Sequence, residues 1–358
     1  SIMTGHMALP EYVRHFKSDA TTEELAMPSS LSHIVLQNLL RDKLNFNGVI
    51  VTDASHMVAM TSAMKRSDML PTAIAAGCDL FLFFNDPEED FNWMMEGYKK
   101  GIITEQRLEE ALTRILGLKA SMGLHKKAKT EILQPKEEAM AKIGTEENKA
   151  VAPEISDKAI TLVKNKQQLL PICPQKHKRV LLVEVKGPES AYGKIMAAMT
   201  SGKKKPIELM KEKLEKEGFE VEIYESAIDK LLKLPPQEMM AAVMNVYAQK
   251  RPIADLTNNY DVIINIADVP PSTDQRIQWN PSKGTPDIPF YVNEVPTIFI
   301  SLQCPFHLAD VPQVKTYINA YDNHEHTLSA VLDKLLGRSE FTGVDPVDSF
   351  CGLIDTQM

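Results

Sequence analysis

Long hydrophobic runs, glycine-rich phosphate loops and an excess of basic residues are all missing from this sequence. No apolar run approaches the roughly 18 residues that a membrane-spanning helix needs, so we expect no membrane partner. The net charge of −8 at pH 7 argues against nucleic acid as a partner. No glycine-rich phosphate motif is present, so we do not expect nucleotide binding. The 44% hydrophobic and 25% charged content over 358 residues is typical of a globular protein of two domains.

Cysteine is scarce, and its spacing forms no metal-type pair. The four cysteines are Cys78, Cys173, Cys304 and Cys351. This pattern favours free thiols in a reducing compartment, and hence a cytoplasmic location. One group in the second half suggests a metal but lacks the i, i+4 spacing of a helical zinc site: His307, His324, Glu325 and His326. We therefore expect no metal site.

Residues 48–57 combine a strand pattern with a carboxylate at its end. Val49, Ile50 and Val51 form a β-branched run typical of a strand that is covered on both faces in a parallel sheet, and Asp53 stands where this strand should end. In α/β folds, side chains at the carboxyl end of a parallel strand face the ligand crevice. Asp53 is therefore our first catalytic candidate. From the strand pattern alone, an aspartate that caps the next helix is an equally good interpretation.

Two further strands, with helices between them, predict three consecutive βα units. Residues 1–6 and 78–85 have the pattern of short strands. Residues 28–32 open a helix whose apolar positions follow helical spacing: Ile34, Val35, Leu39 and Leu40. This helix should end near Gly48, a glycine suited to a C-cap. Strands that alternate with helices predict a parallel sheet.

A second α/β pattern follows a charged segment, residues 126–154, which is rich in Lys, Glu and Ala. The expected strands are residues 179–185, 220–224, 261–266, 297–301 and 315–321, with helices at 206–217 and 327–336. Their alternation predicts a doubly wound, largely parallel sheet. We therefore predict domains at residues 1–125 and 155–358, joined by a helical linker over 126–154.

Residues 269–294 are the least regular part of the second half. Their notable side chains and turn residues are Pro270, Pro271, Arg276, Trp279, Lys283 and Gly284. A long loop that carries Trp and Arg could reach a neighbouring active site or a partner subunit, and a surface loop without a role is an equally good interpretation. Lys203, Lys204 and Lys205 form a short basic run that we expect to be a solvated turn.

Several motifs follow one another in a definite order. The first are Met3-Thr4-Gly5-His6, Pro28-Ser29-Ser30-Leu31-Ser32, Leu39-Leu40-Arg41, the stretch from Leu44 to Ala54 with Met57, and Ala73-Ile74-Ala75-Ala76-Gly77-Cys78-Asp79. Further on come Gly101-Ile102-Ile103, Arg114-Ile115-Leu116-Gly117-Leu118-Lys119 and Ile160-Thr161-Leu162-Val163-Lys164-Asn165. Together they resemble glycoside hydrolase family 3, and within it the bacterial β-N-acetylglucosaminidases of two-domain architecture. The resemblance runs along essentially the whole chain and is looser after Lys176.

The resemblance implies roles for three residues. The aspartate that matches Asp53 is the nucleophile of a retaining mechanism, on the seventh strand of a (β/α)8 barrel. An aspartate suits this role because it is ionised near neutral pH and can attack an anomeric carbon. His6 matches a histidine that lines the sugar subsite, with a satisfied core histidine as the alternative, and Met57 is expected to pack near the sugar. No cofactor is implied.

The acid/base partner implied by the resemblance has no match in this chain. In the glucosaminidase branch it resembles a His-Asp dyad that follows a Lys-His-Phe-Pro-Gly-His-Gly type of sequence after the fifth strand. Arg14-His15-Phe16 lacks the Gly-His element and follows the sixth strand, so we reject this match. His56 is interpreted as a surface or supporting histidine. We therefore expect this chain alone to be inactive.

A full (β/α)8 barrel takes about 250 residues, so the first 125 or so residues supply about three of its eight units. The expected fold is the carboxyl-terminal part of a (β/α)8 TIM barrel followed by a doubly wound α/β sandwich. The expected partners are a carbohydrate substrate and the missing N-terminal barrel half or another subunit. The expected activity is release of terminal β-linked N-acetylglucosamine from glycans or cell-wall fragments with retention of configuration. A phosphorylase, a β-glucosidase and a non-catalytic glycan-binding or scaffold protein are the alternatives.

Overall fold

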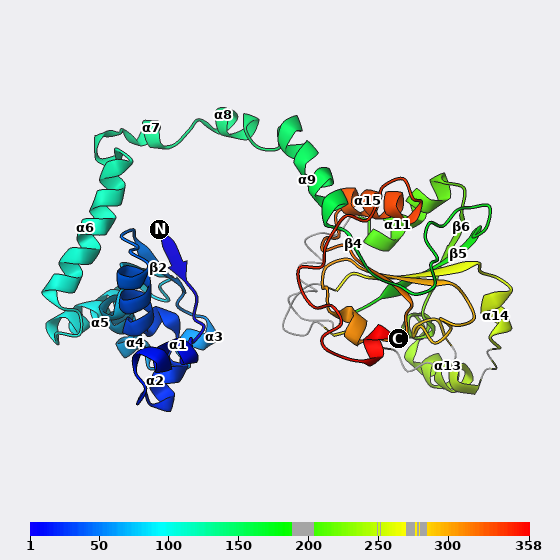
Figure 1. Ribbon diagram of the computed structural model, residues 1–358, viewed down its shortest axis with the longest axis horizontal. Helices are drawn as coiled ribbons and strands as arrows, with labels where there is room; N and C mark the ends of the chain where they lie inside the picture. The colour runs from blue at the N-terminus through cyan, green and yellow to red at the C-terminus, as the bar shows by residue number, and fades with distance from the viewer. Residues whose placement is uncertain (188–203, 249, 251, 270–275, 278, 280–284) are drawn as a thin grey trace. The chain divides into compact units, whose positions relative to one another are not determined.

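The structure is a computed structural model, and it describes residues 1–187, 204–248, 250, 252–269, 276–277, 279 and 285–358. The chain forms two compact units, Ser1–Met140 and Ala141–Met358, each described here by itself (Figure 1). The division falls within the segment predicted as a linker, which contains the helices α7 (Lys129–Ile132), α8 (Lys136–Ala141) and the start of α9 (Glu146–Ala159). Within the described ranges, no helix is long and apolar enough to cross a membrane.

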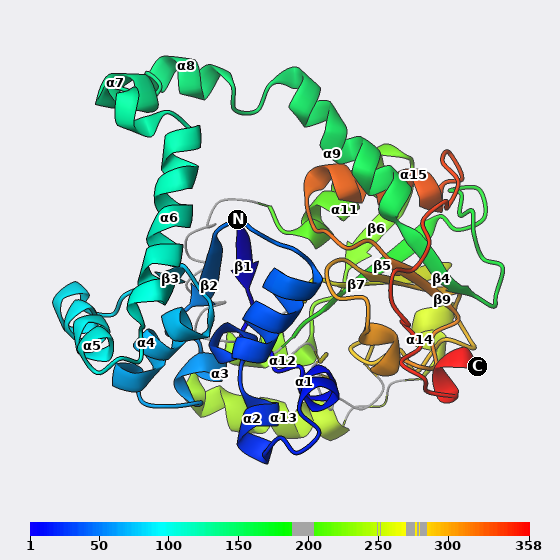
Figure 2. The ribbon, with the colours of Figure 1, turned by 60° about the vertical axis from the view of Figure 1, so that its left-hand side comes forward.

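The first unit is built on a parallel sheet of three strands in the order β1–β2–β3. Its strands are β1 (Ile2–Thr4), β2 (Ile50–Ala54) and β3 (Leu80–Leu82), which Figure 2 shows from a second side. Ile2 pairs with Ile50, and Val51 pairs with Leu80, so β2 is the central strand. The three strands lie where the sequence predicts them.

Helical segments follow each of these strands. The α-helices are α1 (Pro10–Phe16), α2 (Thr22–Ala26), α3 (Val58–Thr61), α4 (Arg66–Ala76), α5 (Pro87–Lys99) and α6 (Glu105–Ser121). Short 3₁₀ turns span Ser29–Leu31 and Leu124–Lys126, and a π-helical segment spans Ile34–Lys43. This segment and α4 pack against the sheet through the buried cluster of Leu36, Ile50, Ala76 and Cys78.

Two local predictions for this unit are wrong. Ile50 and Thr52 are buried but Val51 and Asp53 are only half-buried, because α4 and the π-helical segment pack on the face of β2 that carries Ile50. The strand is therefore fully covered on one face, not on both. The sequence predicts that the helix ends near Gly48, but the π-helical segment ends at Lys43. The residue that adopts a left-handed backbone conformation after it is Asn45, with φ 53°. Asparagine tolerates this conformation better than most residues, so it replaces the expected glycine.

The second unit holds a sheet of six strands in the order β4–β9–β8–β7–β5–β6. The strands are β4 (Thr161–Asn165), β5 (Arg179–Val185), β6 (Glu220–Ile223), β7 (Val262–Ala267), β8 (Thr297–Ser301) and β9 (Thr316–Asn319). Neighbouring strands are parallel except for β4, which pairs antiparallel with β9. The prediction of a mixed α/β fold with parallel sheets is confirmed, and β4 is an additional strand that was not predicted.

Both faces of this sheet are covered. The α-helices that the structure describes after α9 are α11 (Pro206–Lys216), α12 (Ala227–Leu232), α13 (Pro236–Ala248), α14 (Ala254–Thr257) and α15 (Glu325–Leu335), with 3₁₀ turns at His307–Ala309 and Asp355–Gln357. α11 and α15 pack on the face that carries Val180 and Leu182. Leu256 of α14 and Tyr291 pack on the opposite face, against Leu181 and Val183.

The irregular segment after β7 is partly outside the described residues, as are Pro270, Pro271, Lys283 and Gly284. Arg276 forms an ion pair with Asp310, and Trp279 packs against an apolar cluster of the second unit itself. Lys203 also lies outside the described residues. Lys204 and Lys205 form ion pairs with glutamates, as expected of a solvated turn.

The histidines of the second unit have protein partners. His307 is fully buried and lies 2.8 Å from the Ser301 hydroxyl through Nδ1. His324 and His326 both contact the carboxylate of Asp322. In the part of the chain that the structure describes, no three histidines, cysteines or carboxylates come together as a metal site.

Candidate active site

Asp53 lies near the carboxyl end of β2, the central strand of the first unit. Its side chain is half-buried, and Oδ1 accepts a hydrogen bond of 2.7 Å from the backbone N–H of Ala54. Among the described residues, nothing else hydrogen-bonds to this carboxylate. Asp53 does not cap the following helix, because the N-cap residue of α3 is Met57 and no side chain caps it. The carboxylate therefore keeps one oxygen available to a ligand at the carboxyl edge of the sheet.

His6 is buried next to this strand end. Its Nδ1 lies 2.7 Å from the Ser30 hydroxyl and its Nε2 lies 3.1 Å from the carbonyl oxygen of Ala54. A carbonyl can only accept, so Nε2 carries a proton and donates it to Ala54, while Nδ1 is hydrogen-bonded to the Ser30 hydroxyl. Both ring nitrogens are thus engaged by protein, and His6 fixes the backbone directly after Asp53. A contact between His6 and a sugar hydroxyl remains a prediction.

A buried network holds the loop that follows Asp53. Arg66, at the start of α4, donates to both carboxylate oxygens of Asp90, at 2.8 and 2.5 Å. The same guanidinium donates to the Ser55 hydroxyl at 3.1 Å, and Ser55 in turn donates to the carbonyl of Phe83 after β3. Arg66 and Asp90 are largely buried, and a bidentate pair of this kind fixes geometry as well as charge. The network ties the ends of β2 and β3 together.

Exposed apolar side chains surround this edge. Met57 is 43% exposed, and Phe83 and Phe84 are 57% and 62% exposed. The exposed ring of His56 stacks on Phe83 with 6.3 Å between ring centroids, which agrees with its interpretation as a surface histidine. A sugar ring presents C–H faces that pack against such groups. Met57 lies on the surface near the candidate nucleophile in sequence, and its packing against a sugar remains a prediction.

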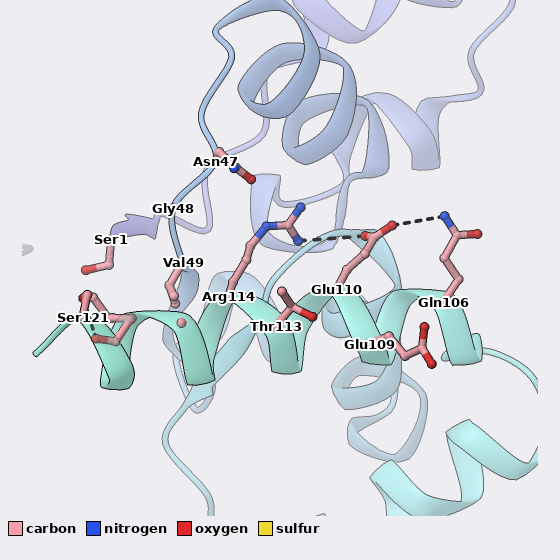
Figure 3. Close-up of a pocket in the computed structure, with 12 residues that line it drawn as sticks. Ser1, Asn47, Gly48, Val49, Gln106, Glu109, Glu110, Thr113, Arg114 and Ser121 are labelled. Atoms are coloured by element: carbon pink, nitrogen blue, oxygen red, sulfur yellow. Dashed lines mark hydrogen bonds and ion pairs between the residues drawn. The ribbon is translucent and has the colours of Figure 1, made fainter. Parts of the chain in front are cut away.

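A groove of about 720 Å³ lies at the opposite, amino end of the strands (Figure 3). Ser1 and Val49, which precede β1 and β2, line it together with α6 residues such as Glu110 and Arg114. Val49 stands four residues before Asp53, so the groove is about 13 Å from the candidate nucleophile along an extended strand. It is therefore not the site of the predicted chemistry.

Beneath this groove, one buried carboxylate receives three guanidinium groups. Asp79, with a fully buried side chain, accepts from Arg41 at 2.8 Å, from Arg107, and from Arg114 at 3.4 Å. It also accepts from the backbone N–H of Ile50 at 2.9 Å. Burial lowers the pKa of Arg41 and the neighbouring Asp79 opposes that shift. This cluster anchors the amino end of β2 and is structural.

The sequence did not reveal Ser55, Arg66, Asp79 or Asp90 as partners. Arg66 and Asp90 are 24 residues apart, and no periodic pattern links them. Asp90 stands in the first turn of α5 beside Glu88 and Glu89. Acidic residues are common in the first turn of any helix, because the helix dipole favours negative charge there. Only the pairing seen in three dimensions distinguishes Asp90 from its acidic neighbours.

Comparisons with known proteins identify the family of this chain. Residues 1–118 match the model described as the glycosyl hydrolase family 3 N terminal domain. Over 361 aligned residues, the chain is 35% identical to a protein of Cellulomonas fimi named beta-N-acetylglucosaminidase/beta-glucosidase, with 100% of this chain and 59% of that protein covered. The chain belongs to glycoside hydrolase family 3.

Solved structures of this family are also similar. A structure described as a beta-glucoside phosphorylase aligns with a TM-score of 0.81 and 38% identity, and covers 99% of this chain and 58% of that one. A family 3 β-N-acetylglucosaminidase from Paenibacillus sp. aligns with a TM-score of 0.59 at 20% identity, over 89% of this chain and 54% of that one, and supports the fold. This chain therefore spans less than two thirds of the length of each of these relatives.

Proposed function

We propose that the full-length protein is a retaining β-glycosidase in which Asp53 is the nucleophile. The observation that carries this proposal is the half-buried Asp53 carboxylate at the carboxyl end of the central strand, within the segment that matches the family 3 domain. Its carboxylate would attack the anomeric carbon and form a glycosyl-enzyme, while a general acid protonates the departing oxygen. Water activated by the same group would then release the sugar with retained configuration.

We further propose that the first unit is the carboxyl-terminal part of a (β/α)8 barrel. The cover of helices on one face of the three-stranded sheet supports this, since a barrel packs helices outside and turns the other face of each strand inward. Under this proposal the barrel part is residues 1–125, the linker is 126–154 and the α/β sandwich is 155–358. The remaining barrel strands and the acid/base group would come from an N-terminal barrel half or another subunit. The scarcity of cysteine and the lack of a metal-type cysteine pair in the sequence support a cytoplasmic location.

The proposed substrate is a glycan or cell-wall fragment with a terminal β-linked N-acetylglucosamine. The name of the Cellulomonas fimi relative supports this and equally supports a β-glucosidase. The relative described as a beta-glucoside phosphorylase supports a second candidate function, in which phosphate and not water takes the glycosyl group. In each case Asp53 forms a covalent glycosyl-enzyme, so the candidates differ in the sugar that is transferred and in the acceptor that takes it.

The test uses full-length protein and two aryl glycosides, a β-N-acetylglucosaminide and a β-glucoside, each with and without phosphate. We expect faster release from the N-acetylglucosaminide and no acceleration by phosphate. Asp53→Asn should lower kcat at least about a thousandfold, because the nucleophile is lost. Asp68→Asn, an exposed aspartate on α4, is the matched control and should leave kcat unchanged. Sugar binding without turnover in the wild-type protein would instead favour a non-catalytic glycan-binding protein.

A further inference from the structure

A second groove, of about 350 Å³, lies in the second unit beside β6 and α14, both labelled in Figure 1. All the residues that line it belong to the second unit. They include three aromatic side chains, the carboxylates of three acidic residues and one lysine: Tyr224, Tyr260, Phe290, Glu222, Glu225, Asp255 and Lys230. The proposed glycosidase reaction uses none of these groups.

The aromatic walls of this groove are held in place by hydrogen bonds and packing. The Tyr260 hydroxyl donates to Glu222 Oε2 at 2.7 Å, and the Tyr224 hydroxyl donates to Asp287 Oδ2 at 3.0 Å. The Phe290 ring is 44% exposed and packs edge-on against Tyr291, with 5.3 Å between ring centroids. The groove thus offers aromatic surface that does not need to reorganise when a ligand binds.

Three carboxylates and one lysine line the groove, so its described lining carries a net negative charge. Among the described residues, Glu222 and Asp255 form no ion pair with a basic side chain. Glu225, which also lines the groove, differs because Lys233 pairs with it at 2.5 Å and Lys230 approaches to 4.0 Å. Burial and the hydrogen bond to Glu222 raise the pKa of Tyr260.

Aromatic faces beside unpaired carboxylates attract organic cations, since the ring quadrupole and the carboxylate charge both favour an ammonium group. A neutral sugar would use the rings but would leave both carboxylates without a counter-charge. We propose that this groove binds a small organic ligand that carries a primary ammonium group. An amino sugar and a linear polyamine both supply this chemistry.

Isothermal titration of the chain tests the proposal with three probes: a trimer of β-linked glucosamine, the same trimer fully N-acetylated, and spermidine. The two glucosamine trimers differ in charge while sharing the same sugar backbone. We expect the amine trimer to bind at least about fivefold more tightly than the acetylated one. Glu222→Gln keeps an acceptor for Tyr260 but removes the charge, and should weaken amine binding about fivefold. Glu147→Gln, an exposed acid on α9, is the control and should change nothing.

Each outcome decides the proposal. Tighter binding of spermidine than of the amine trimer supports the site and identifies a polyamine as its ligand, and the reverse order identifies an amino sugar. Absence of binding by both amines, detectable and equal binding of the two trimers, or unchanged amine binding in Glu222→Gln overturns the proposal. Asp53→Asn should leave amine binding intact, so failure of the proposed glycosidase function and failure of this groove are distinguishable.

Discussion

Replacing Asp79 by asparagine should strongly destabilise the first unit. The side chain of Asp79 is fully buried and is the shared acceptor for Arg41, Arg107 and Arg114, whose side chains are 8, 8 and 20% exposed. Asparagine has nearly the same shape but no charge. Among the described residues, the other carboxylate that pairs with these guanidinium groups is the half-exposed Glu110, which reaches Arg107 and Arg114. Loss of one partner from a buried ion pair costs about 3 to 5 kcal/mol.

This cost is large enough to measure by urea denaturation. With a slope of about 2 kcal/mol per molar urea, a loss of about 4 kcal/mol lowers the unfolding midpoint by about 2 M. The chain has two tryptophans, Trp93 in the first unit and Trp279 in the second. A Trp279→Phe background therefore leaves Trp93 fluorescence as a reporter of the first unit, where Trp93 packs against the core.

Glu11→Gln supplies the control for this measurement. Glu11 pairs with Arg14 on α1, but their side chains are 82% and 49% exposed. An exposed pair contributes less than about 1 kcal/mol, so this midpoint should move by no more than about 0.5 M. If Asp79→Asn shifted the midpoint no further than Glu11→Gln does, the assignment of Asp79 as the anchor of β2 would be refuted.

Two further perturbations test other parts of the fold. Burial acts to raise the pKa of Asp322, but hydrogen bonds from Thr327 and His324 outweigh it and hold this pKa at about 2. Asp322→Asn should therefore lower the free energy of unfolding by about 1 kcal/mol at pH 6, a value discounted because the Asp322 side chain is 34% exposed. The loss should shrink as the pH falls from about 4 towards 2, because the wild-type carboxylate becomes protonated there. Urea unfolding at each pH measures it. Gly77→Ala should lower Tm, because φ is 137° and the added Cβ would lie 2.9 Å from Leu36 Cβ. Gly117→Ala, inside α6 with open space around it, should instead raise Tm; equal changes in the two variants would contradict this account.

The strands could be predicted because their residues carry the signal themselves. β5 and β8 have the bounds that the sequence predicts, since each is rich in apolar residues and pairs with parallel strands on both sides. β4 was not predicted as a strand, because Thr161–Asn165 is short, has only two apolar residues, Leu162 and Val163, and pairs at the sheet edge with β9. Such a segment depends on its partner strand more than on its own composition.

The candidate site was only partly predictable for a related reason. Asp53 could be singled out because a carboxylate that ends a buried strand is a local feature of the sequence. The partners that shape its surroundings are distant: His6 reaches Ala54 across 48 residues and Arg66 reaches Asp90 across 24. Local patterns carry no information on such pairs, so only the folded arrangement reveals which polar groups are neutralised and which oxygen of Asp53 is left open.

Trapping of the covalent intermediate tests the central claim most directly. Full-length protein is incubated with a 2-fluoro or 5-fluoro glycosyl donor that forms the glycosyl-enzyme quickly and releases it slowly, and the labelled peptide is mapped by mass spectrometry. The account predicts a single adduct, one sugar on the carboxylate of Asp53, and none in Asp53→Asn. An adduct on any other residue, or turnover without a covalent adduct, would contradict it.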